Sequence, residues 1–331
     1  MSAAPGPGGF FPPRPDGHPG LAVFLNAGDP PHLLADLALM LDEEGVEVLE
    51  LAVPFPNSPT DGPVIRRSAA RALAAGTTLD TVLAELARLR PALKRLKVAL
   101  LADWSHSLRH RDPAELCRAI AAAGADALLV HALPPRLRAT WHHACQDTGL
   151  AQVTTCYPTS TPEVLADAAR AATGAYVYLV AHYGRSGTTP AAGHQSLADT
   201  VRTLRAHTPP TAGPVPVAVG FGVKNAADLQ AVAAAGADAA IVGSAAVARL
   251  EHDLDTGGDV VAGLRAYLHD LRPPRSPQPG PAGRTTSTTS TTGTASTTST
   301  ASTTSTTGTA STTGSATGTT GRAGTPTTLT R

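Results

Sequence analysis

Residues 229–248 read LQAVAAAGADAAIVGSAAVA, and this stretch holds the parts from which the fold can be derived. From Leu229 to Ala235 apolar side chains recur every three residues, which is the spacing of one helix face. Gly236 follows at a place where helices commonly end in the left-handed conformation. A short apolar run, Ala239–Val242, then predicts a strand that is covered on both faces. The stretch therefore predicts one helix–strand unit of a parallel sheet.

The same unit recurs between Gly20 and Arg272. Two other helix candidates end in a similar phrase, Glu44-Gly45-Val46-Glu47 and Ala123-Gly124-Ala125-Asp126. Most strand candidates are continuously apolar rather than alternating, as expected for parallel strands. The candidates are Leu21–Asn26, Val48–Ala52, Val98–Ala102, Ala127–Val130, Gln152–Cys156, Tyr176–Val180, Val215–Val219 and Ala239–Val242.

Eight such units in about 250 residues fit an α/β fold of the (β/α)₈ or TIM-barrel type. A doubly wound open sheet is the alternative. That fold normally places a glycine-rich turn directly after its first strand, whereas Asn26–Pro30 reads NAGDP and does not match GxGxxG. We therefore predict a TIM barrel over residues 20–272.

The ends of the chain differ from this region in composition. Residues 1–19 are rich in Pro and Gly and are expected to precede the barrel. Residues 273–331 consist almost entirely of Thr, Ser, Ala, Gly and Pro. Because such a segment cannot bury enough apolar surface to offset its conformational entropy, we expect a disordered tail.

Charge and cysteine content limit the class of protein. The 26 basic and 26 acidic residues give zero net charge, so neither nucleic acid nor an anionic membrane is an expected partner. No apolar run is long enough to span a membrane, and the N-terminus lacks the basic region of a signal peptide. The three cysteines are far apart in sequence, which favours reduced thiols in a cytoplasmic protein over a metal site. His142-His143, near Cys145, is expected on a solvated helix face.

Glu50 is the first candidate for chemistry, because it lies within the apolar strand candidate Val48–Ala52. It must face either the barrel interior or the helix layer, and both disfavour an unpaired charge. Desolvation should raise its pKa, which suits a group that transfers protons. The alternative is a structural Glu that pairs with an Arg.

Asp61 is the second candidate, and it is the single acid in the long loop Pro54–Pro63. It directly precedes a Gly-Pro pair that opens a helix. Asp61 is therefore either a helix cap or a catalytic residue on a lid at the barrel mouth.

Glycines follow the last two strand candidates, as Gly220-Phe221-Gly222 and as Gly243-Ser244. Glycine lets backbone N–H groups approach a ligand, and the helix that begins at Gly243-Ser244 presents its positive end to an anion. Barrels with phosphate sites usually build them at this place. We predict a phosphate site, with two ordinary turns as the alternative.

These motifs, in this order, resemble the tryptophan synthase α-subunit family. The resemblance covers all eight units, and its most specific part is the second strand with the aspartate loop. The segments that carry it are Leu49–Leu51, Pro54-Phe55, Asp61–Pro63, Phe24–Pro30, Arg185–Thr189, Gly220–Gly222 and Gly243-Ser244.

The resemblance implies a lyase of tryptophan biosynthesis that cleaves indole-3-glycerol phosphate to indole and glyceraldehyde 3-phosphate without a metal or an organic cofactor. It also implies a tryptophan synthase β subunit as partner. Glu50 would protonate indole C3 and move the proton of the glycerol hydroxyl, and Asp61 would accept a hydrogen bond from the indole N–H. The other implied contacts are Phe24, Leu101, Tyr178 and Phe221 for the indole ring, Gly222, Gly243 and Ser244 for the phosphate, and Thr189 for the loop that closes over Asp61.

The chain departs from the family's usual pattern around this site. Pro56–Thr60 replaces a Ser-Asp-Pro-Leu-Ala loop that touches the β subunit, and Asp103–Ser105 stands where Tyr-Ala-Asn is usual. His131-Ala132 replaces Ala-Asp, which removes a pocket acid. His182–Gly184 is extra, and Pro190, which has no N–H to offer a phosphate, replaces a glycine. A Pro/Gly-rich segment also replaces the N-terminal helix that usually plugs the barrel.

Three functions therefore stay open at the level of sequence. The first is the α chain of tryptophan synthase. The second is a stand-alone lyase that releases indole, or acts on a modified indole, in specialised metabolism. The third is a non-catalytic barrel that binds and modulates a β subunit. Retention of both Glu50 and Asp61 favours an enzyme.

Overall fold

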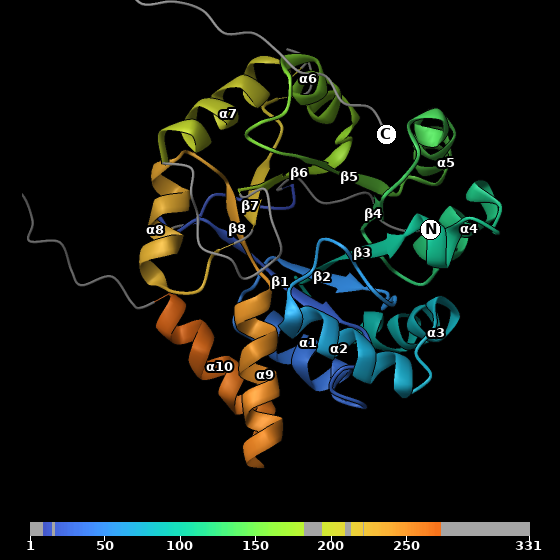
Figure 1. The fold of residues 1–331 in the computed structure, drawn as a ribbon, viewed down its shortest axis with the longest axis vertical. Coiled ribbons are helices and arrows are strands. Elements are labelled where there is room, and N and C mark those ends of the chain that lie inside the picture. The colour runs from blue at the N-terminus through green and yellow to red at the C-terminus, as the bar shows by residue number, and fades with distance from the viewer. Residues whose placement is uncertain (1–8, 15–16, 182–193, 209–212, 221, 273–331) are drawn as a thin grey trace, which may run out of the picture. The chain divides into compact units, whose positions relative to one another are not determined.

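The structure is a computed structural model that describes residues 9–14, 17–181, 194–208, 213–220 and 222–272, apart from the side chains of residues 194–196. The expected tail, and Thr189, Pro190 and Phe221, lie outside these residues. Eight parallel strands close into a barrel in chain order, and helices surround it (Figure 1). The TIM-barrel prediction is confirmed, and the open-sheet alternative is wrong. The strands are β1 (Gly20–Asn26), β2 (Val48–Ala52), β3 (Lys97–Asp103), β4 (Ala127–His131), β5 (Ala151–Cys156), β6 (Gly174–Val180), β7 (Val217–Gly220) and β8 (Ala239–Val242).

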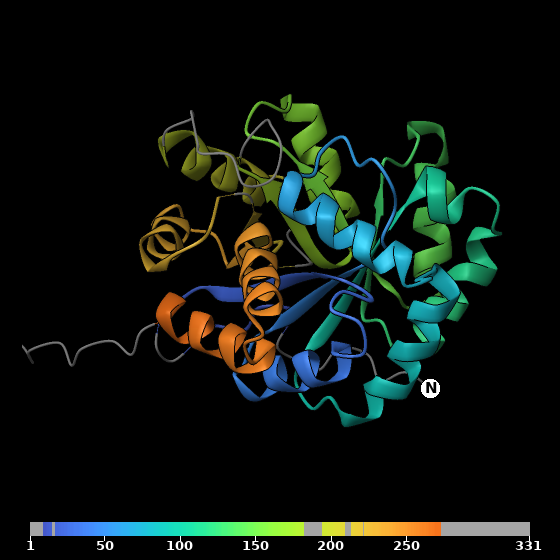
Figure 2. The ribbon, with the colours of Figure 1, turned by 60° about the horizontal axis from the view of Figure 1, so that its bottom comes forward.

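The helices cover the outside of this barrel. The last two, α9 and α10, pack against each other beside the first helices, as the orange and blue ribbons show in Figure 2. Within the described residues, no helix is both long and apolar enough to cross a bilayer. The helices are α1 (Leu34–Glu43), α2 (Pro63–Ala74), α3 (Leu79–Leu89), α4 (Pro113–Ala122), α5 (Arg138–Thr148), α6 (Pro162–Ala171), α7 (His194–Ala206), α8 (Ala226–Ala234), α9 (Ser244–Thr256) and α10 (Val260–Leu271), with short helical turns at Arg90–Ala92, Trp104–Leu108 and Pro135–Leu137.

The strand bounds agree with the sequence-based ones to within two residues. The largest shifts are of two residues: β6 begins at Gly174 instead of Tyr176, and β7 begins at Val217 instead of Val215. Pro216 has no N–H to donate to a neighbouring strand, so the ladder starts after it. β7 also includes Gly220, which the sequence analysis had assigned to the following turn.

The barrel has an inner and an outer apolar core, and β2 shows how the sequence divides between them. Successive side chains of a strand point to opposite faces. Leu49 and Leu51 belong to the core between the sheet and the helices. Val48 belongs to the cluster inside the barrel, so Glu50, two residues further on, also faces the interior.

The lower part of the interior is filled by the N-terminal segment. Phe10 and Phe11 are 1% and 9% exposed, and their rings lie 5.6 and 5.1 Å from the Tyr176 ring, centroid to centroid. The space for these rings exists because several residues of the same cluster on the strands are alanines, including Ala22, Ala99, Ala127, Ala218 and Ala239. The boundary placed at residue 20 stays a prediction, but two side chains from before it form part of the barrel core.

The Gly-containing phrases that precede the even-numbered strands β2, β4 and β8 have a shared structural role. Gly45, Gly124 and Gly236 have φ angles of 68°, 93° and 79°, which confirms the left-handed helix ends. The acid at the end of each phrase then accepts the N–H of a residue at or near the start of the preceding strand. These bonds run from Leu21 to Glu47 (2.7 Å), from Val98 to Asp126 (2.8 Å) and from Val217 to Asp238 (2.8 Å).

Candidate active site in the barrel mouth

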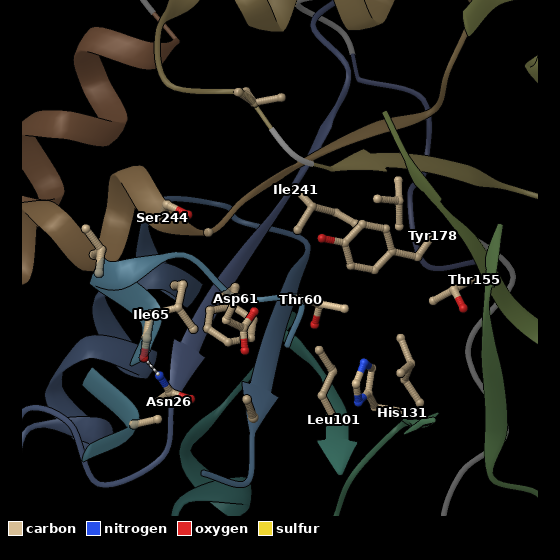
Figure 3. Close-up of a pocket in the computed structure, with 18 of the residues that line it drawn as sticks. Asn26, Thr60, Asp61, Ile65, Leu101, His131, Thr155, Tyr178, Ile241 and Ser244 are labelled. Atoms are coloured by element: carbon tan, nitrogen blue, oxygen red, sulfur yellow. Dashed lines mark hydrogen bonds between the residues drawn. The ribbon is translucent and has the colours of Figure 1, made fainter. Parts of the chain in front are cut away.

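A cavity of about 450 Å³ opens at the C-terminal ends of the strands (Figure 3). This is the end at which TIM-barrel enzymes carry their active sites, and the volume lies in the range of small-molecule pockets. The cavity brings together seven of the residues named from the sequence: Phe24, Asp61, Leu101, Tyr178, Gly222, Gly243 and Ser244. Ile241 and Leu129 add to its apolar wall.

Glu50 lies inside the barrel but is not part of the cavity wall. Its side chain is fully buried, and Oε1 accepts a 2.7 Å hydrogen bond from the Tyr176 hydroxyl of β6, on another side of the barrel. Among the described residues, Oε2 is buried and has no hydrogen-bond partner. Burial raises the Glu50 pKa to about 7, and the Tyr176 bond opposes this only in part. The raised pKa was expected, but the alternative of a Glu–Arg pair is wrong.

Tyr178 connects Glu50 with the cavity. Burial raises the pKa of its hydroxyl well above 10, and the charges of both Glu50 and Asp61 contribute, so both carboxyls are within electrostatic reach of this side chain. The ring occupies space that only a glycine at position 220 leaves open. A Cβ on Gly220 would lie 2.3 Å from Cε2 of Tyr178.

Asp61 lies at the cavity wall, in front of α2 (Figure 3). The N-cap residue of α2 is Gly62, so Asp61 lies one residue before the cap position and is not the helix cap of the alternative interpretation. Burial raises the Asp61 pKa, against the lowering effects of a Ser58 hydrogen bond and of His131 and Arg66. A half-buried carboxyl that faces a cavity is available for a ligand.

Buried polar contacts hold the aspartate loop and α2 in place. Asn26, at the end of β1, donates through Nδ2 to the Ile65 carbonyl (3.2 Å) and to the Ser68 hydroxyl (2.9 Å). Arg71 of α2 makes two hydrogen bonds with Asp29, at 2.8 and 2.9 Å. A third hydrogen bond joins Arg71 to Glu251 of α9 at 2.8 Å. These contacts fix the position of Asp61 relative to the start of α9.

The glycines predicted to bind phosphate lie together at one end of the cavity. Gly222 has a φ angle of 101°, which side chains rarely permit. Gly243 caps α9 without any side-chain hydrogen bond, so the first N–H groups of this helix, starting at Ser244, are open to an anion. Lys224 lines the same cavity and adds a cation.

Sequence reasoning missed a cluster at the opposite wall. Asp103 ends β3, is 3% exposed, and accepts hydrogen bonds from Nδ1 of His106 (2.7 Å) and Nδ1 of His131 (3.0 Å). Phe55 lies against both imidazole rings, at centroid distances of 5.2 and 5.8 Å. Asp103 and His131 are register partners of β3 and β4, a pairing that no local sequence pattern reveals. Asp103 thus places a buried carboxylate in the pocket although Ala132 replaces the usual acid.

The remaining sequence-based candidates cannot be placed. Thr189 and Phe221, as well as His182, Arg185 and Pro190, lie outside the described residues. Among the described residues, no group of three or more His, Cys, Asp or Glu side chains is arranged to hold a metal ion. Cys117, Cys145 and Cys156 are buried free thiols, as expected.

The fold and the site define a TIM-barrel protein with a mainly apolar cavity at its mouth, acidic side chains at the cavity wall, including Asp61 and Asp103, and a buried carboxyl, Glu50, inside the barrel. The family profile described as tryptophan synthase alpha chain matches residues 14–272. The chain belongs to the tryptophan synthase α chain family.

Individual relatives agree with this assignment. A tryptophan synthase alpha chain from Burkholderia multivorans is 36% identical over 260 residues, which is 77% of this chain and 91% of that protein. The crystal structure of tryptophan synthase subunit alpha from Legionella pneumophila superposes with a TM-score of 0.67 at 27% identity, and covers 77% of this chain and 91% of that one. A Mycobacterium tuberculosis tryptophan synthase structure gives 0.64 at 29% identity, with 77% and 92% covered.

Proposed function

We propose that this protein cleaves indole-3-glycerol phosphate to indole and glyceraldehyde 3-phosphate, as the α chain of a tryptophan synthase. The observation that carries the proposal is the arrangement of one cavity. Asp61 and the apolar wall would bind the indole ring, and the N-terminus of α9 together with Gly222 would bind the phosphate.

The reaction needs two proton transfers, and two carboxyls in different environments can divide the work. Protonation of indole C3 places positive charge on the ring, which Asp61 stabilises through a hydrogen bond from the ring N–H. Removal of the glycerol hydroxyl proton then forms the aldehyde. The C–C bond breaks, and its electron pair returns to the ring as neutral indole.

Glu50 is the acid and base in this proposal. Its pKa of about 7 suits a group that gives and takes a proton near neutral pH. In the structure it faces Tyr176 beneath the cavity, so it must turn away from that hydroxyl to reach the substrate. The lack of a partner for Oε2 lowers the cost of this rotation, because only one hydrogen bond is lost.

A turnover assay with indole-3-glycerol phosphate tests the proposal. We expect release of glyceraldehyde 3-phosphate and indole, measured separately by a coupled dehydrogenase and by chromatography. No turnover in the presence or absence of a tryptophan synthase β chain contradicts it.

We further propose a tryptophan synthase β chain as the partner, because the relatives are named as α chains and subunits. Co-purification with a β chain, together with faster cleavage on its addition, tests this. The altered loop Pro56–Thr60, together with Ala132 and Pro190, favours a second candidate, a stand-alone lyase. High turnover that no β chain changes, without a complex, favours that second candidate.

A further inference from the structure

The cavity has two chemically different ends. Gly222, Gly243 and Ser244 lie at the ends of β7 and β8, where the proposed phosphate site is. On the far wall, the ends of β4 and β5 contribute His131 and Thr155, both of which border the cavity (Figure 3). The six-membered ring of unsubstituted indole carries only C–H groups, so it needs no polar partner on that wall.

The imidazole of His131 is held in one orientation. Its Nδ1 lies 3.0 Å from Oδ2 of Asp103, and the Phe55 ring lies against its face. The other oxygen of Asp103 is occupied by His106 and by the Ser105 hydroxyl, at 2.7 Å each. Rotation of the Asp103 carboxylate away from His131 would therefore also break its hydrogen bonds with His106 and Ser105.

This contact also determines which nitrogen of His131 carries a proton. The hydrogen bonds that Asp103 accepts outweigh its burial and lower its pKa to about 2, so it is an ionised group that can only accept. Nδ1 of His131 must then be the donor, and in the neutral ring Nε2 is left as an acceptor. Among the described residues, no group donates to Nε2.

The proposed binding mode directs one part of the substrate to this wall. Figure 3 shows Ser244 and Asp61 on the α9 and α2 side of the cavity, and His131 and Thr155 across from them. With the phosphate at the start of α9 and the indole N–H at Asp61, the six-membered ring of the substrate would therefore extend toward His131 and Thr155. Its C–H edge would meet the Nε2 lone pair of His131 and the Thr155 hydroxyl. A hydrogen bond that the site is built to make would then stay unmade.

We propose that the natural substrate is an indole-3-glycerol phosphate whose six-membered ring carries a hydrogen-bond donor, a hydroxyl or an amino group, that binds Nε2 of His131. Asp103 is the positioning residue that holds this histidine. The inference rests on the proposed function, because it uses the same site and the same cleavage. It narrows the substrate class and gives the wall formed by His131 and Thr155 a role in substrate selection.

Sites built to bond a substrate hydroxyl discriminate strongly against analogues that lack it. We expect kcat/KM for at least one of the 4-, 5-, 6- and 7-hydroxy isomers to exceed that for the unsubstituted substrate by tenfold or more, measured in competition. This ratio, rather than absolute activity, is the readout, because it does not depend on the amount of active protein.

Three variants test the residues. His131→Ala and His131→Leu, one small and one close in volume to histidine, should each reduce the ratio at least tenfold. Asp103→Asn, which permits the other tautomer of His131, should reduce the ratio more than it reduces cleavage of the unsubstituted substrate. His106→Ala is the matched control, because it removes the second imidazole from the same carboxylate but does not border the cavity. It should leave the ratio within about threefold of the parent value.

The outcomes separate this inference from the proposed function. If the parent protein cleaves the unsubstituted substrate and prefers it to all four isomers, the inference is wrong while the function stands. If both His131 variants retain the parent ratio, His131 does not select the substrate. If none of the five compounds is cleaved, the proposed function and the inference fall together.

Discussion

At the scale of single residues, Glu50 combines a proposed function with a cost to the fold. It is fully buried, one carboxyl oxygen has no hydrogen-bond partner in the part of the chain that the structure describes, and burial raises its pKa to about 7. A buried polar group with an unsatisfied oxygen destabilises the fold, and a functional role is one reason for a protein to retain it. The amide in Glu50→Gln has nearly the same shape but cannot transfer a proton.

The first prediction is that Glu50→Gln lowers kcat by about two to four powers of ten, which is the usual contribution of general acid–base catalysis. Steady-state cleavage of indole-3-glycerol phosphate measures it. Circular dichroism should show an unchanged fold. A kcat within threefold of the parent value would remove Glu50 from the mechanism.

The second prediction concerns the pH dependence of stability. An unfolded chain loses the Glu50 proton near pH 4.5, whereas the folded chain retains it to about pH 7. The folded state thus loses stability, relative to the unfolded one, as pH rises from about 4.5 to 7, by on the order of 3 kcal/mol. Glu50→Gln removes this loss, so its stability relative to the parent should increase between pH 5 and pH 8. Urea unfolding at both values measures the change, with the surface variant Asp80→Asn as control. An equal difference at both pH values contradicts a raised pKa.

The third prediction is that Asp61→Asn lowers kcat by at least tenfold and changes KM less. The carboxylate is proposed to stabilise charge that develops on the indole ring in the transition state. Isothermal titration with the uncleavable mimic indolepropanol phosphate should show retained binding. A lower melting temperature with normal kcat would instead show a structural role for Asp61.

At the scale of secondary-structure elements, the barrel depends on one close approach between neighbouring strands. Gly220 of β7 lies against the side chain of Tyr178 of β6, and a Cβ there would come within 2.7 Å of two ring carbons and the hydroxyl oxygen. The Tyr178 side chain is partly buried and lines the cavity, so the open space into which it can move is the proposed substrate site.

The fourth prediction is therefore that Gly220→Ala lowers stability by about 1–3 kcal/mol and raises KM, because Tyr178 must move into the cavity. Chemical denaturation and steady-state kinetics measure the two effects. In a Tyr178→Ala background the same substitution should cost much less, since the clash is gone. Equal costs in both backgrounds would show that the ring is not the cause.

Sequence patterns predicted the strands well because parallel barrel strands are short apolar runs. They could not tell whether Glu50 faces inward, because alternation places it with Val48 but does not say which face is inside. Its partner Tyr176 is 126 residues away in sequence, and Asp103 meets His131 only through the register of β3 and β4. Such contacts are set by closure of the barrel and not by local spacing.

At the scale of the whole molecule, the N-terminal segment completes a column of aromatic and carboxyl groups along the barrel axis. Phe10 and Phe11 support Tyr176 from below, and Tyr176 holds Glu50. The proposed acid thus depends on residues that precede the first strand. Replacing both phenylalanines by alanine should cost several kcal/mol of stability, since each Phe→Ala change in a core typically costs about 3–5.

Removal of the Phe10 and Phe11 rings would also open a binding site for small molecules inside the barrel. Without the two rings, the space under Tyr176 is bordered by small, apolar side chains and becomes an empty chamber the size of two benzene rings. Apolar chambers of this kind stay dry and accept small aromatic guests. The fifth prediction is that benzene raises the melting temperature of the Phe10→Ala/Phe11→Ala protein by several degrees and that of the parent by much less. Differential scanning fluorimetry across a benzene series decides it, and equal shifts would mean that the barrel collapses onto the vacated space. A larger benzene effect on the variant would show that this part of the barrel is a binding site for small aromatic molecules, which the parent protein fills with its own N-terminal segment.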